Sequence, residues 1–281
     1  MIIRVPLKIN RLQKMWSGLA LLAALAGCGG GGHIDYGVVP RVFLIVMENK
    51  SPEEALTGQF TASLAARAWV ANNYHAITHP SVPNYLALTS GSTWGVTDDS
   101  YHVLPRRDLG TQLTVAGVTW RAYMEGLDDG GCLNSPVPYD PGHNPFAFYG
   151  GACPSNVVPL TQLAADLRGN TPRFVWITPD RCHDTHDCSV AVGDEWLKQT
   201  VGEITASAGW KSDGILYITW DEDDGSGSNR VLTLAVTPGM VHAKSNDPYD
   251  HYSLLARIEV VLGVGRLGAA AQAQPLPDML P

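Results

Sequence analysis

The chain has 281 residues, of which 45% are hydrophobic and 16% charged, and 19 Lys and Arg stand against 27 Asp and Glu for a formal net charge of −8. This composition is that of a folded protein and excludes a disordered chain, a collagen and a coiled coil. The acidic balance argues against a nucleic-acid binder, because binding along a phosphate backbone needs a basic stripe. The five cysteines are an odd number and need a separate explanation.

The N-terminal segment has the pattern of an export signal. Four basic residues within the first 14 precede an apolar run at 15–26, which is too short to span a membrane. The run ends in Leu-Ala-Gly-Cys, which resembles a bacterial lipobox and implies cleavage before Cys28 and lipidation of its sulfur. We therefore expect a signal peptide at 1–27, a lipidated cysteine with a flexible tether at 28–40, and an exported protein anchored to a membrane and facing the periplasm or cell exterior. An ordinary signal peptide with an incidental cysteine is the alternative.

Removal of that signal leaves four cysteines and, with 15 basic against 27 acidic residues, a net charge of −12. An exported domain should carry its cysteines as disulfides, and four thiols allow three pairings. Proximity in the sequence favours Cys132–Cys153 and Cys182–Cys188. A structural zinc site that uses Cys182 and Cys188 is the competing interpretation.

Apolar patterns typical of strands and helices alternate along the chain. In chain order we expect a strand at Val42–Met47, helices at Thr61–Asn72 and Pro83–Ser90, a strand at Val118–Met124, a helix at Leu160–Leu167, a strand at Arg173–Thr178, a helix at Asp194–Ala206, strands at Ile215–Trp220 and Val231–Thr237, and a helix at Tyr252–Leu262. This alternation predicts an α/β fold whose mostly parallel central sheet has helices on both faces. The Gly- and Pro-rich stretch at 128–159 should be a surface excursion, and the low-complexity tail at 269–281 should fray.

Acidic and amide residues follow two of the predicted strands directly. Glu48 and Asn49 follow the first, and the run Asp221-Glu222-Asp223-Asp224 follows the strand that ends at Trp220. Carboxylates this close repel one another unless a cation lies among them, so a divalent metal is the natural hypothesis. A solvated acidic turn that closes at Gly225 is an equally good interpretation of the second segment alone.

Ser81 precedes Pro83, which is well placed in the first turn of a helix. At the start of a helix, free backbone N–H groups and the helix dipole favour an anion, although Ser81 taken alone is more simply a helix cap. A Gly-x-Ser-x-Gly elbow is absent from the sequence, which disfavours an α/β-hydrolase triad.

The segment Pro179–Cys188 contains two histidines and three aspartates within eight residues, which suits either metal ligation or phosphate contact if a disulfide closes it. His251 at the start of the last helix is a weak signal by itself.

As an ordered set, these segments resemble the phosphoesterase family of bacterial acid phosphatases and phosphocholine-type phospholipases C, within the alkaline phosphatase superfamily. The resemblance is strongest to its acid phosphatase branch. It is carried by VMENKS at 46–51, THPSVPNYLALTSGSTWGVTDD at 78–99, GVTWRAYMEGL at 117–127, HNPFAFY at 143–149, ITPDRCHDTHDCSVAVGDEWL at 177–197, ITWDEDDG at 218–225 and DHYSLLARIE at 250–259. It implies a three-layer α/β sandwich with a mostly parallel sheet, in a single phosphoesterase domain at 41–268.

The resemblance also implies the roles of particular residues. It makes Ser81 the nucleophile, with catalytic histidines at His183, His186 and His251. It implies a divalent metal of unknown identity, with ligands Glu48, Asn49, Ser81, Asp221 and Glu222, where Asp223 could replace Glu222. It places His79, Asn84, His143 and Asn144 around the substrate, and it leaves the roles of Asp98 and Asp99 open.

The resulting prediction is an acid phosphatase-like phosphomonoesterase that acts through a covalent phosphoserine on Ser81, with a protonated histidine donating to the leaving group and favouring acid pH. Its partners would be a small phosphorylated substrate and, through the lipid anchor alone, a membrane. Phosphodiester cleavage of the phospholipase C type and a non-catalytic surface lipoprotein are the alternatives. A sulfatase is disfavoured because Tyr85 stands where its Ser-x-Pro-x-Arg motif needs arginine.

Overall fold

The structure is a computed structural model that describes residues 40–225, 227–239 and 242–278. The predicted signal peptide, Cys28 and most of its tether lie outside these residues. Among the described residues, no helix is both long enough and apolar enough to cross a membrane.

An eight-stranded sheet with the strand order β5-β4-β6-β1-β7-β8-β2-β9 forms the centre of the fold. All its strands run parallel except β8, which is antiparallel to both of its neighbours. In chain order the strands are β1 Arg41–Met47, β2 Trp69–Ala71, β4 Trp120–Met124, β5 Val157–Pro159, β6 Phe174–Thr178, β7 Gly214–Trp220, β8 Thr233–Val236 and β9 Ala243–Ser245; β3 Tyr74–His75 and β10 Tyr249–Asp250 form a separate parallel pair.

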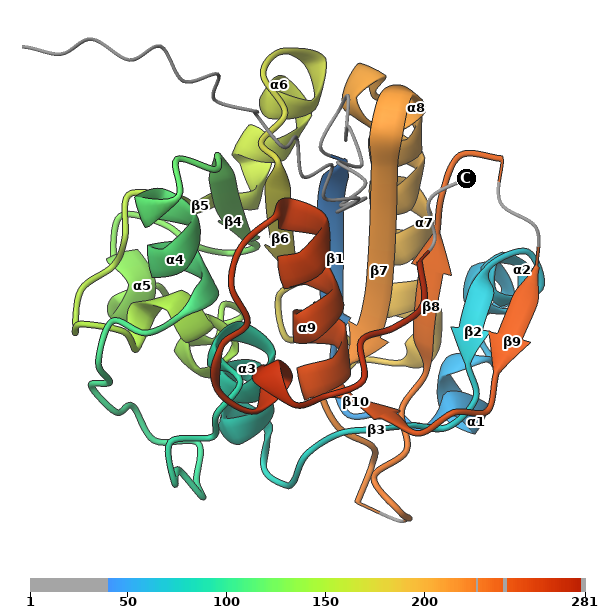
Figure 1. Cartoon of the computed structure of the whole chain (residues 1–281), viewed down its shortest axis with the longest axis horizontal. Coiled ribbons are helices and arrows are strands. Elements are labelled where there is room, and N and C mark those ends of the chain that lie inside the picture. Colours follow the sequence, from blue (N-terminus) through green and yellow to red (C-terminus); the bar gives the residue numbers. More distant parts are fainter. Residues whose placement is uncertain (1–39, 226, 240–241, 279–281) are drawn as a thin grey trace, which may run out of the picture. The chain divides into compact units, whose positions relative to one another are not determined.

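Helices cover both faces of the sheet. Figure 1 shows α9 in front of β1 and α7 behind β7, so the three layers expected from the alternating pattern are confirmed. The α-helices are α1 Pro52–Ala55, α2 Gln59–Ala65, α3 Ser81–Ser90, α4 Leu109–Val115, α5 Gly131–Asn134, α6 Leu163–Arg168, α7 Val190–Ala206, α8 Ala208–Asp213 and α9 His251–Leu262; short 3-10 turns lie at Pro141–His143, Pro145–Ala147, Leu160–Gln162 and Gly268–Ala271.

The central strands are apolar along their whole length because both of their faces are covered. In β1 every residue from Val42 to Met47 is fully buried, and β6 and β7 are buried throughout. All five predicted strands are present, within a few residues of their expected limits.

The helix predicted at Thr61–Asn72 is wrong in its second half. Helix α2 ends at Ala65, and Trp69–Ala71 forms strand β2 instead. Val70 pairs with Leu234 of β8 and with Lys244 of β9, partners more than 160 positions away in the chain. Tertiary pairing therefore overrides the local Ala-rich pattern.

Two other expectations about irregular segments need correction. The tail packs against the domain as far as Leu276, because Ala270 and Leu276 are buried and the Leu276 N–H donates to the Ser253 carbonyl. The excursion at 128–159 is not confined to the surface, because Phe146 and Phe148 are buried. Apolar side chains thus anchor both segments.

The two disulfides are Cys132–Cys153 and Cys182–Cys188, as proximity in the sequence predicts. Their formation consumes the thiols, so the alternative zinc site on Cys182 and Cys188 is wrong.

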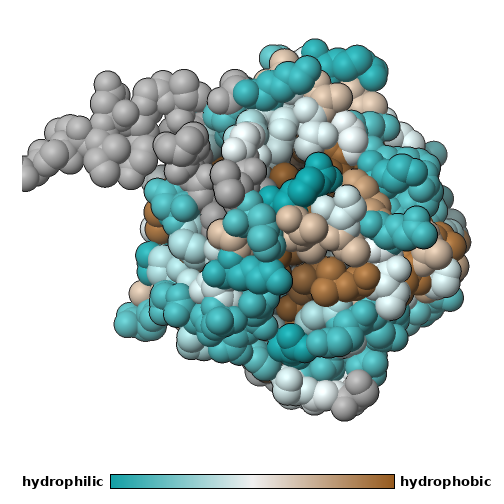
Figure 2. All heavy atoms as spheres, turned by 90° about the vertical axis from the view of Figure 1, so that its right-hand side faces the viewer, coloured by the Kyte–Doolittle hydropathy of each residue, from teal (hydrophilic) through white to brown (hydrophobic). Residues whose placement is uncertain are grey.

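Apolar side chains also line a cavity near the edge of the sheet that β2 and β9 form. Leu56, Val70 and Leu232 line a cavity of about 480 Å³ between α1, α2 and β2, on the side of the molecule that Figure 2 shows. Its lining includes none of the residues predicted for the functional site.

Candidate active site

The predicted metal ligands meet at the carboxyl ends of β1 and β7. These two strands pair in register up to Met47 and Trp220, so the residues that follow them emerge side by side. The Asp221 N–H donates to the Met47 carbonyl, and the Asn49 N–H donates to Asp221 Oδ1 at 3.2 Å. Glu48 and Asp221 are fully buried. The site therefore lies where parallel sheets ordinarily place their ligands.

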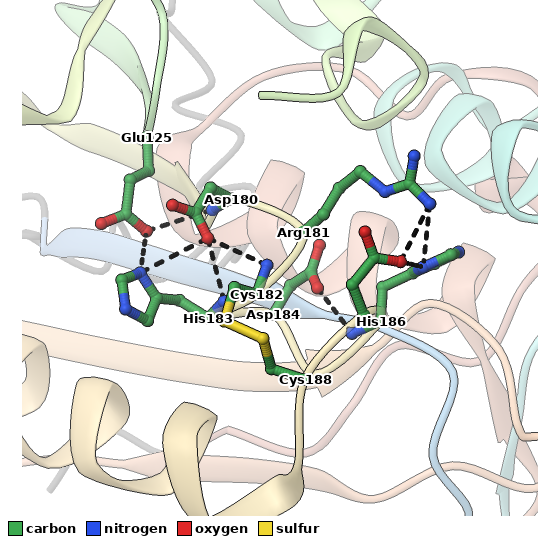
Figure 3. Close-up of a disulfide and its surroundings, with 9 residues drawn as sticks. Glu125, Asp180, Arg181, Cys182, His183, Asp184, His186 and Cys188 are labelled. Carbon is green, nitrogen blue, oxygen red and sulfur yellow. Dashed lines mark hydrogen bonds and ion pairs between the residues drawn. A yellow bond between two sulfur atoms is a disulfide. The ribbon is translucent and has the colours of Figure 1, made fainter. Parts of the chain in front are cut away.

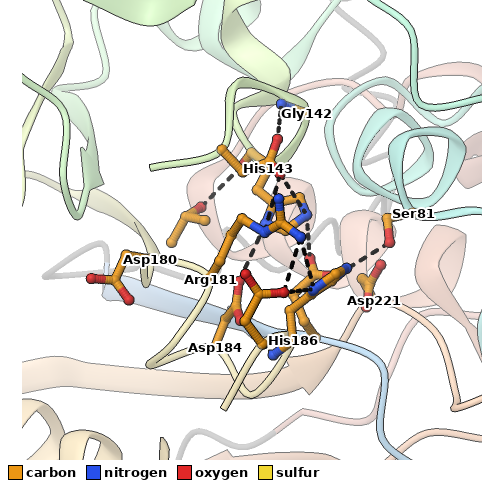
Figure 4. A network of polar contacts seen from close by, with 12 residues as sticks. Ser81, Gly142, His143, Asp180, Arg181, Asp184, His186 and Asp221 are labelled. Atoms are coloured by element: carbon orange, nitrogen blue, oxygen red, sulfur yellow. Dashed lines mark hydrogen bonds and ion pairs between the residues drawn. The ribbon is translucent and has the colours of Figure 1, made fainter. Parts of the chain in front are cut away.

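Ser81 is the first residue of α3 and points at these carboxylates. Its Oγ lies 3.2 Å from Glu48 Oε2 and 3.3 Å from Glu222 Oε1. The cap residue of α3 is Pro80, and no side chain at that position bonds the helix. The hydroxyl of Ser81 is thus engaged with carboxylates and not with the helix backbone, which removes the simpler interpretation of Ser81 as a cap. Figure 4 shows Ser81 beside Asp221.

The start of α3 is less open to an anion than the sequence suggests. Pro83 has no N–H, and the Val82 N–H donates to Asp99 Oδ1 at 3.0 Å. Asp99 therefore occupies one of the donors that we expected to be free. Asp98, in contrast, is bound to its own loop, where it accepts from the Ser100 N–H and contacts His102 at 2.8 Å.

Burial and mutual repulsion make the carboxylates of the site hard to ionise. Burial, followed by the charges of Asp221 and Asp184, raises the pKa of Glu48 well above its ordinary value. Burial raises the pKa of Asp221 to about 6. Burial and then the charge of Asp221 raise the pKa of Glu222 to about 9. A bound cation would reverse these penalties.

The donor set fits a hard divalent cation. Asp221 Oδ2 is buried and has no hydrogen-bond partner among the described residues. The inward-facing terminal atom of the Asn49 amide lies 2.6 Å from Glu48 Oε2 and 3.1 Å from Asp221 Oδ1. If this atom is the amide nitrogen, it donates to both carboxylates. If it is the amide oxygen, three oxygen atoms face one another, and a cation among them is needed to offset their repulsion. Carboxylate, amide and hydroxyl oxygens are the ligands that magnesium, calcium and manganese prefer.

His143 links this cluster to a residue that the predictions missed. Its Nδ1 lies 3.2 Å from Asp184 Oδ2 and its Nε2 lies 3.5 Å from Glu48 Oε1. Burial alone lowers the pKa of His143, but its bond to Asp184 and the surrounding negative charge raise it overall. Ligand atoms of Glu48, His143 and Asp184 all lie within 4.8 Å of one another, so these residues form a second candidate cation set that shares Glu48.

Tyr85 is also a residue that the predictions did not place in the site. Its hydroxyl donates to Glu48 Oε1, and its ring stacks on His143 with centroids 5.4 Å apart. Tyr85 lies one helical turn after Ser81, and this spacing of four residues is the signal in the sequence that could have found it.

The two histidines of the 180–188 hairpin lie in different surroundings. His183 Nδ1 lies 3.0 Å from Glu125 Oε2 and 3.4 Å from Asp180 Oδ1 (Figure 3). It has no hydrogen bond or ion pair with Ser81 among the described residues. His183 also lines a cavity of about 1130 Å³ between α6 and α7.

His186 lies on the side of Ser81 and His143. Its ring centroid is 5.9 Å from that of His143, its Nδ1 contacts Asp187 Oδ1 at 2.7 Å, and its side chain is 32% exposed. Figure 4 shows His186 in the same network as His143 and Arg181. His186 therefore lies beside His143, which contacts Glu48, whereas His183 contacts Glu125 and Asp180.

His251 is buried beneath the site. Its Nε2 lies 2.6 Å from the Asp221 carbonyl and its Nδ1 lies 3.0 Å from the Tyr74 hydroxyl, so both ring nitrogens have partners inside the protein. Burial lowers the pKa of His251 to about 4. A neutral ring held in this way fixes the backbone of Asp221.

Asn84 fixes the loop before Ser81. Its Oδ1 accepts from the N–H groups of Ile77 and Thr78, and its Nδ2 donates to the Thr78 and Pro80 carbonyls and to Glu222 Oε2. These bonds engage both ends of the amide.

Of two further residues with a predicted substrate role, His79 contacts the carboxylates of the cluster and Asn144 bonds a residue outside it. His79 is exposed and bridges Glu222 at 2.9 Å and Asp223 at 3.3 Å. Asn144 is fully buried and donates to the Tyr139 hydroxyl at 2.9 Å.

Comparison with known proteins agrees with this geometry. The model of the Phosphoesterase family matches residues 46–265. A phosphatidylinositol-3-phosphatase of Mycobacterium tuberculosis is 30% identical, over 95% of both chains. A phosphate-repressible acid phosphatase of Penicillium chrysogenum is 28% identical and an acid phosphatase of Aspergillus fumigatus 25% identical, each over 81% of this chain. The chain spans 60% and 56% of the length of these two fungal relatives.

Solved structures share the fold at low sequence identity. A protein of the alkaline phosphatase superfamily from Vibrio parahaemolyticus superimposes with a TM-score of 0.62 at 11% identity, over 85% of this chain and 71% of that one. Murine ectonucleotide pyrophosphatase/phosphodiesterase 5 gives a TM-score of 0.58 at 8% identity, over 81% and 96%. The chain thus shares its three-layer fold with these proteins. The chain belongs to the Phosphoesterase family and is a hydrolase of phosphoric ester bonds.

Proposed function

We propose that the protein is a metal-dependent phosphomonoesterase that works through a covalent phosphoserine on Ser81. The observation that carries this proposal is the position of the Ser81 hydroxyl, at the start of α3 and within hydrogen-bond reach of Glu48 and Glu222. The names of the relatives, a phosphatidylinositol phosphatase and acid phosphatases, support a monoester substrate.

The metal would be held by oxygen atoms of Glu48, Asn49, Ser81, Asp221 and Glu222. When bound there, a divalent cation would lower the pKa of the Ser81 hydroxyl and offset the charge of the phosphate. The unpartnered Asp221 Oδ2 supports this assignment.

Ser81 Oγ then attacks phosphorus opposite the ester oxygen. The Oγ–P bond forms, the ester P–O bond breaks, and the serine proton is accepted by one of the carboxylates within reach, Glu48 or Glu222. The leaving oxygen takes a proton from a histidine, and we assign this role to His186, because its ring lies beside His143 while His183 pairs with Glu125. The contact between His186 Nδ1 and Asp187 leaves Nε2 to exchange this proton.

In the second half-reaction, water attacks the phosphoserine and the now neutral His186 accepts a proton from it. The Ser81 Oγ–P bond breaks, Ser81 Oγ takes back the proton held by Glu48 or Glu222, and inorganic phosphate leaves. His143 and His79 would contact the equatorial oxygens of the phosphate. The contacts of His251, Asn84 and Asn144 support positioning roles, because these buried side chains bond other parts of the protein.

Export and membrane anchoring belong to the same proposal. Two disulfides support a protein that matures outside the cytoplasm, and lipidation of Cys28 would tether it there.

The test measures turnover of p-nitrophenyl phosphate by wild type, Ser81→Ala and Asp221→Asn, with and without a chelator. We expect both variants and the chelated wild type to lose activity, and one particular metal to restore the wild type alone. Ser63→Ala, which removes an exposed hydroxyl on α2, is the matched control. Full activity in Ser81→Ala would overturn the nucleophile, and faster turnover of a p-nitrophenyl phosphocholine diester would favour the phosphodiesterase alternative.

A further inference from the structure

An exposed acidic side chain bonds the residue after the nucleophile and takes no part in the mechanism above. Asp99 Oδ1 accepts the Val82 N–H at 3.0 Å, one residue beyond the nucleophile. Asp99 is exposed, whereas the first residues of α3, to which it bonds, are buried. Its carboxylate thus occupies a backbone donor that an anion bound at Ser81 would otherwise receive.

Asp99 also acts electrostatically on the machinery around Ser81. After burial and the charge of Asp221, the charge of Asp99 contributes to the raised pKa of Glu222, whose Oε1 lies 3.3 Å from Ser81 Oγ. A phosphate group bound to Ser81 would therefore lie near the carboxylate of Asp99, which accepts the N–H of the next residue. Like charges this close repel, and an exposed pair is screened only in part.

We propose, building on the phosphatase function proposed above, that Asp99 is a specificity-determining residue that selects the monoanionic form of a phosphomonoester. A phosphomonoester carries one charge below about pH 6 and approaches two above it. The second charge is the one that Asp99 opposes. The substrate class is therefore a phosphomonoester in mildly acidic surroundings, with selection made by the ionisation of the substrate.

Other charged groups lie around Ser81 on each neighbouring element, and all of them remain in the chain when Asp99 is replaced. They are Glu48 after β1, Asp221, Glu222 and Asp223 after β7, His79 before α3, His143 before Asn144, and Asp184 and His186 in the hairpin after β6. The ratio of variant to wild-type kcat/KM at each pH cancels the titration of the groups that Asp99 does not affect. Glu222 is the exception, because the charge of Asp99 contributes to its pKa, and the sulfate measurement below separates its titration from that of the substrate.

The experiment compares Asp99→Asn with wild type on p-nitrophenyl phosphate from pH 4.5 to 8. Asparagine keeps an oxygen that can accept the Val82 N–H and loses only the charge. We expect the ratio of kcat/KM to lie near one at the acid end and to rise through about pH 6 to about tenfold at the alkaline end. Asp98→Asn, which removes a charge from the same loop, is the matched control and should give a flat ratio. A flat ratio for Asp99→Asn overturns the inference.

A purely structural role makes a different prediction. If Asp99 only caps α3, Asp99→Asn behaves like wild type at every pH, and Asp99→Ala loses stability by thermal denaturation. That pattern also overturns the inference.

A binding measurement separates failure of this inference from failure of the proposed function. The ligand is sulfate, which stays a dianion across the whole pH range. Its binding to Ser81→Ala is measured by calorimetry, which needs no turnover. We expect Ser81→Ala/Asp99→Asn to bind sulfate about tenfold more tightly than Ser81→Ala at every pH. Equal sulfate affinity overturns the role of Asp99. Tighter sulfate binding, with no hydrolysis by wild type, supports that role and overturns the phosphatase proposal.

Discussion

Replacement of Asp221 by asparagine should make the metal-free protein more stable at neutral pH while it abolishes activity. Burial raises the pKa of Asp221 from 3.8 to about 6 in the folded protein. The folded state therefore binds the proton more tightly than the unfolded state, so the free energy of unfolding falls as the pH rises between these two values. At 1.36 kcal/mol for each pKa unit, the loss above pH 6 is about 3 kcal/mol.

Asparagine removes this penalty and keeps an oxygen for the Asn49 N–H. For a domain of this size, about 3 kcal/mol corresponds to a rise in melting temperature of about 6–12 °C. The measurement is thermal unfolding by circular dichroism in EDTA at several pH values from 4 to 8. The readout is the difference in melting temperature between variant and wild type. His251 has a lowered pKa, so it makes the stability of both proteins rise with pH, opposite to the effect of Asp221, and the difference removes this contribution. Asp98→Asn, outside the buried cluster, should show no such difference.

Two results would refute this reasoning. If Asp221→Asn is less stable than wild type at pH 7 in EDTA, buried charge is not the dominant cost at the site. If the stability difference is the same at pH 4 and pH 7, the carboxyl does not titrate in the window that its burial predicts. Addition of the activating metal should stabilise the wild type at pH 7 by mass action and leave the variant unchanged.

Three further changes test the supporting structure. Asn84→Ala leaves two part-buried backbone donors without a partner and removes one partner from a buried carboxylate, so urea unfolding should show a loss of about 3 kcal/mol; a loss under 1 kcal/mol would contradict the network. His251→Gln should lower kcat and keep the wild-type inflections of the pH–rate profile, because the native ring stays neutral above its pKa of about 4; loss of an inflection would reassign it as an acid or base. Replacement of Cys182 and Cys188 together by serine should lower the free energy of unfolding in denaturant by about 2 kcal/mol and should lower kcat. Unchanged kcat would show that the disulfide does not help to position the site.

The sequence predicts the layers of this fold well because its central strands are buried on both faces. Continuous apolar runs such as Val42–Met47 have few other structures available. Prediction fails where distant partners decide the structure. Trp69 and Val70 follow an Ala-rich helical pattern, and they become a strand because β8 and β9 supply partners that no local pattern reveals.

The residues at strand ends were also predictable, since parallel strands deliver Glu48 and Asp221 to one edge of the sheet. The orientation of side chains in the 180–188 hairpin was not. His183 and His186 are three positions apart in an irregular loop, where no helical or strand period says which one faces Ser81. Asp184 was missed for the same reason.

The central claim is that Ser81 carries the phosphoryl group during turnover, and acid-quenched enzyme tests it most directly. Wild type mixed with p-nitrophenyl phosphate and quenched within one turnover should yield, by peptide mass spectrometry, a phosphorylated peptide whose modified residue is Ser81. The phosphorylated peptide should disappear when the substrate is used up before the quench, and it should be absent from Asp221→Asn. Phosphate found on a histidine, or full turnover with no label on Ser81 at any quench time, would contradict the account.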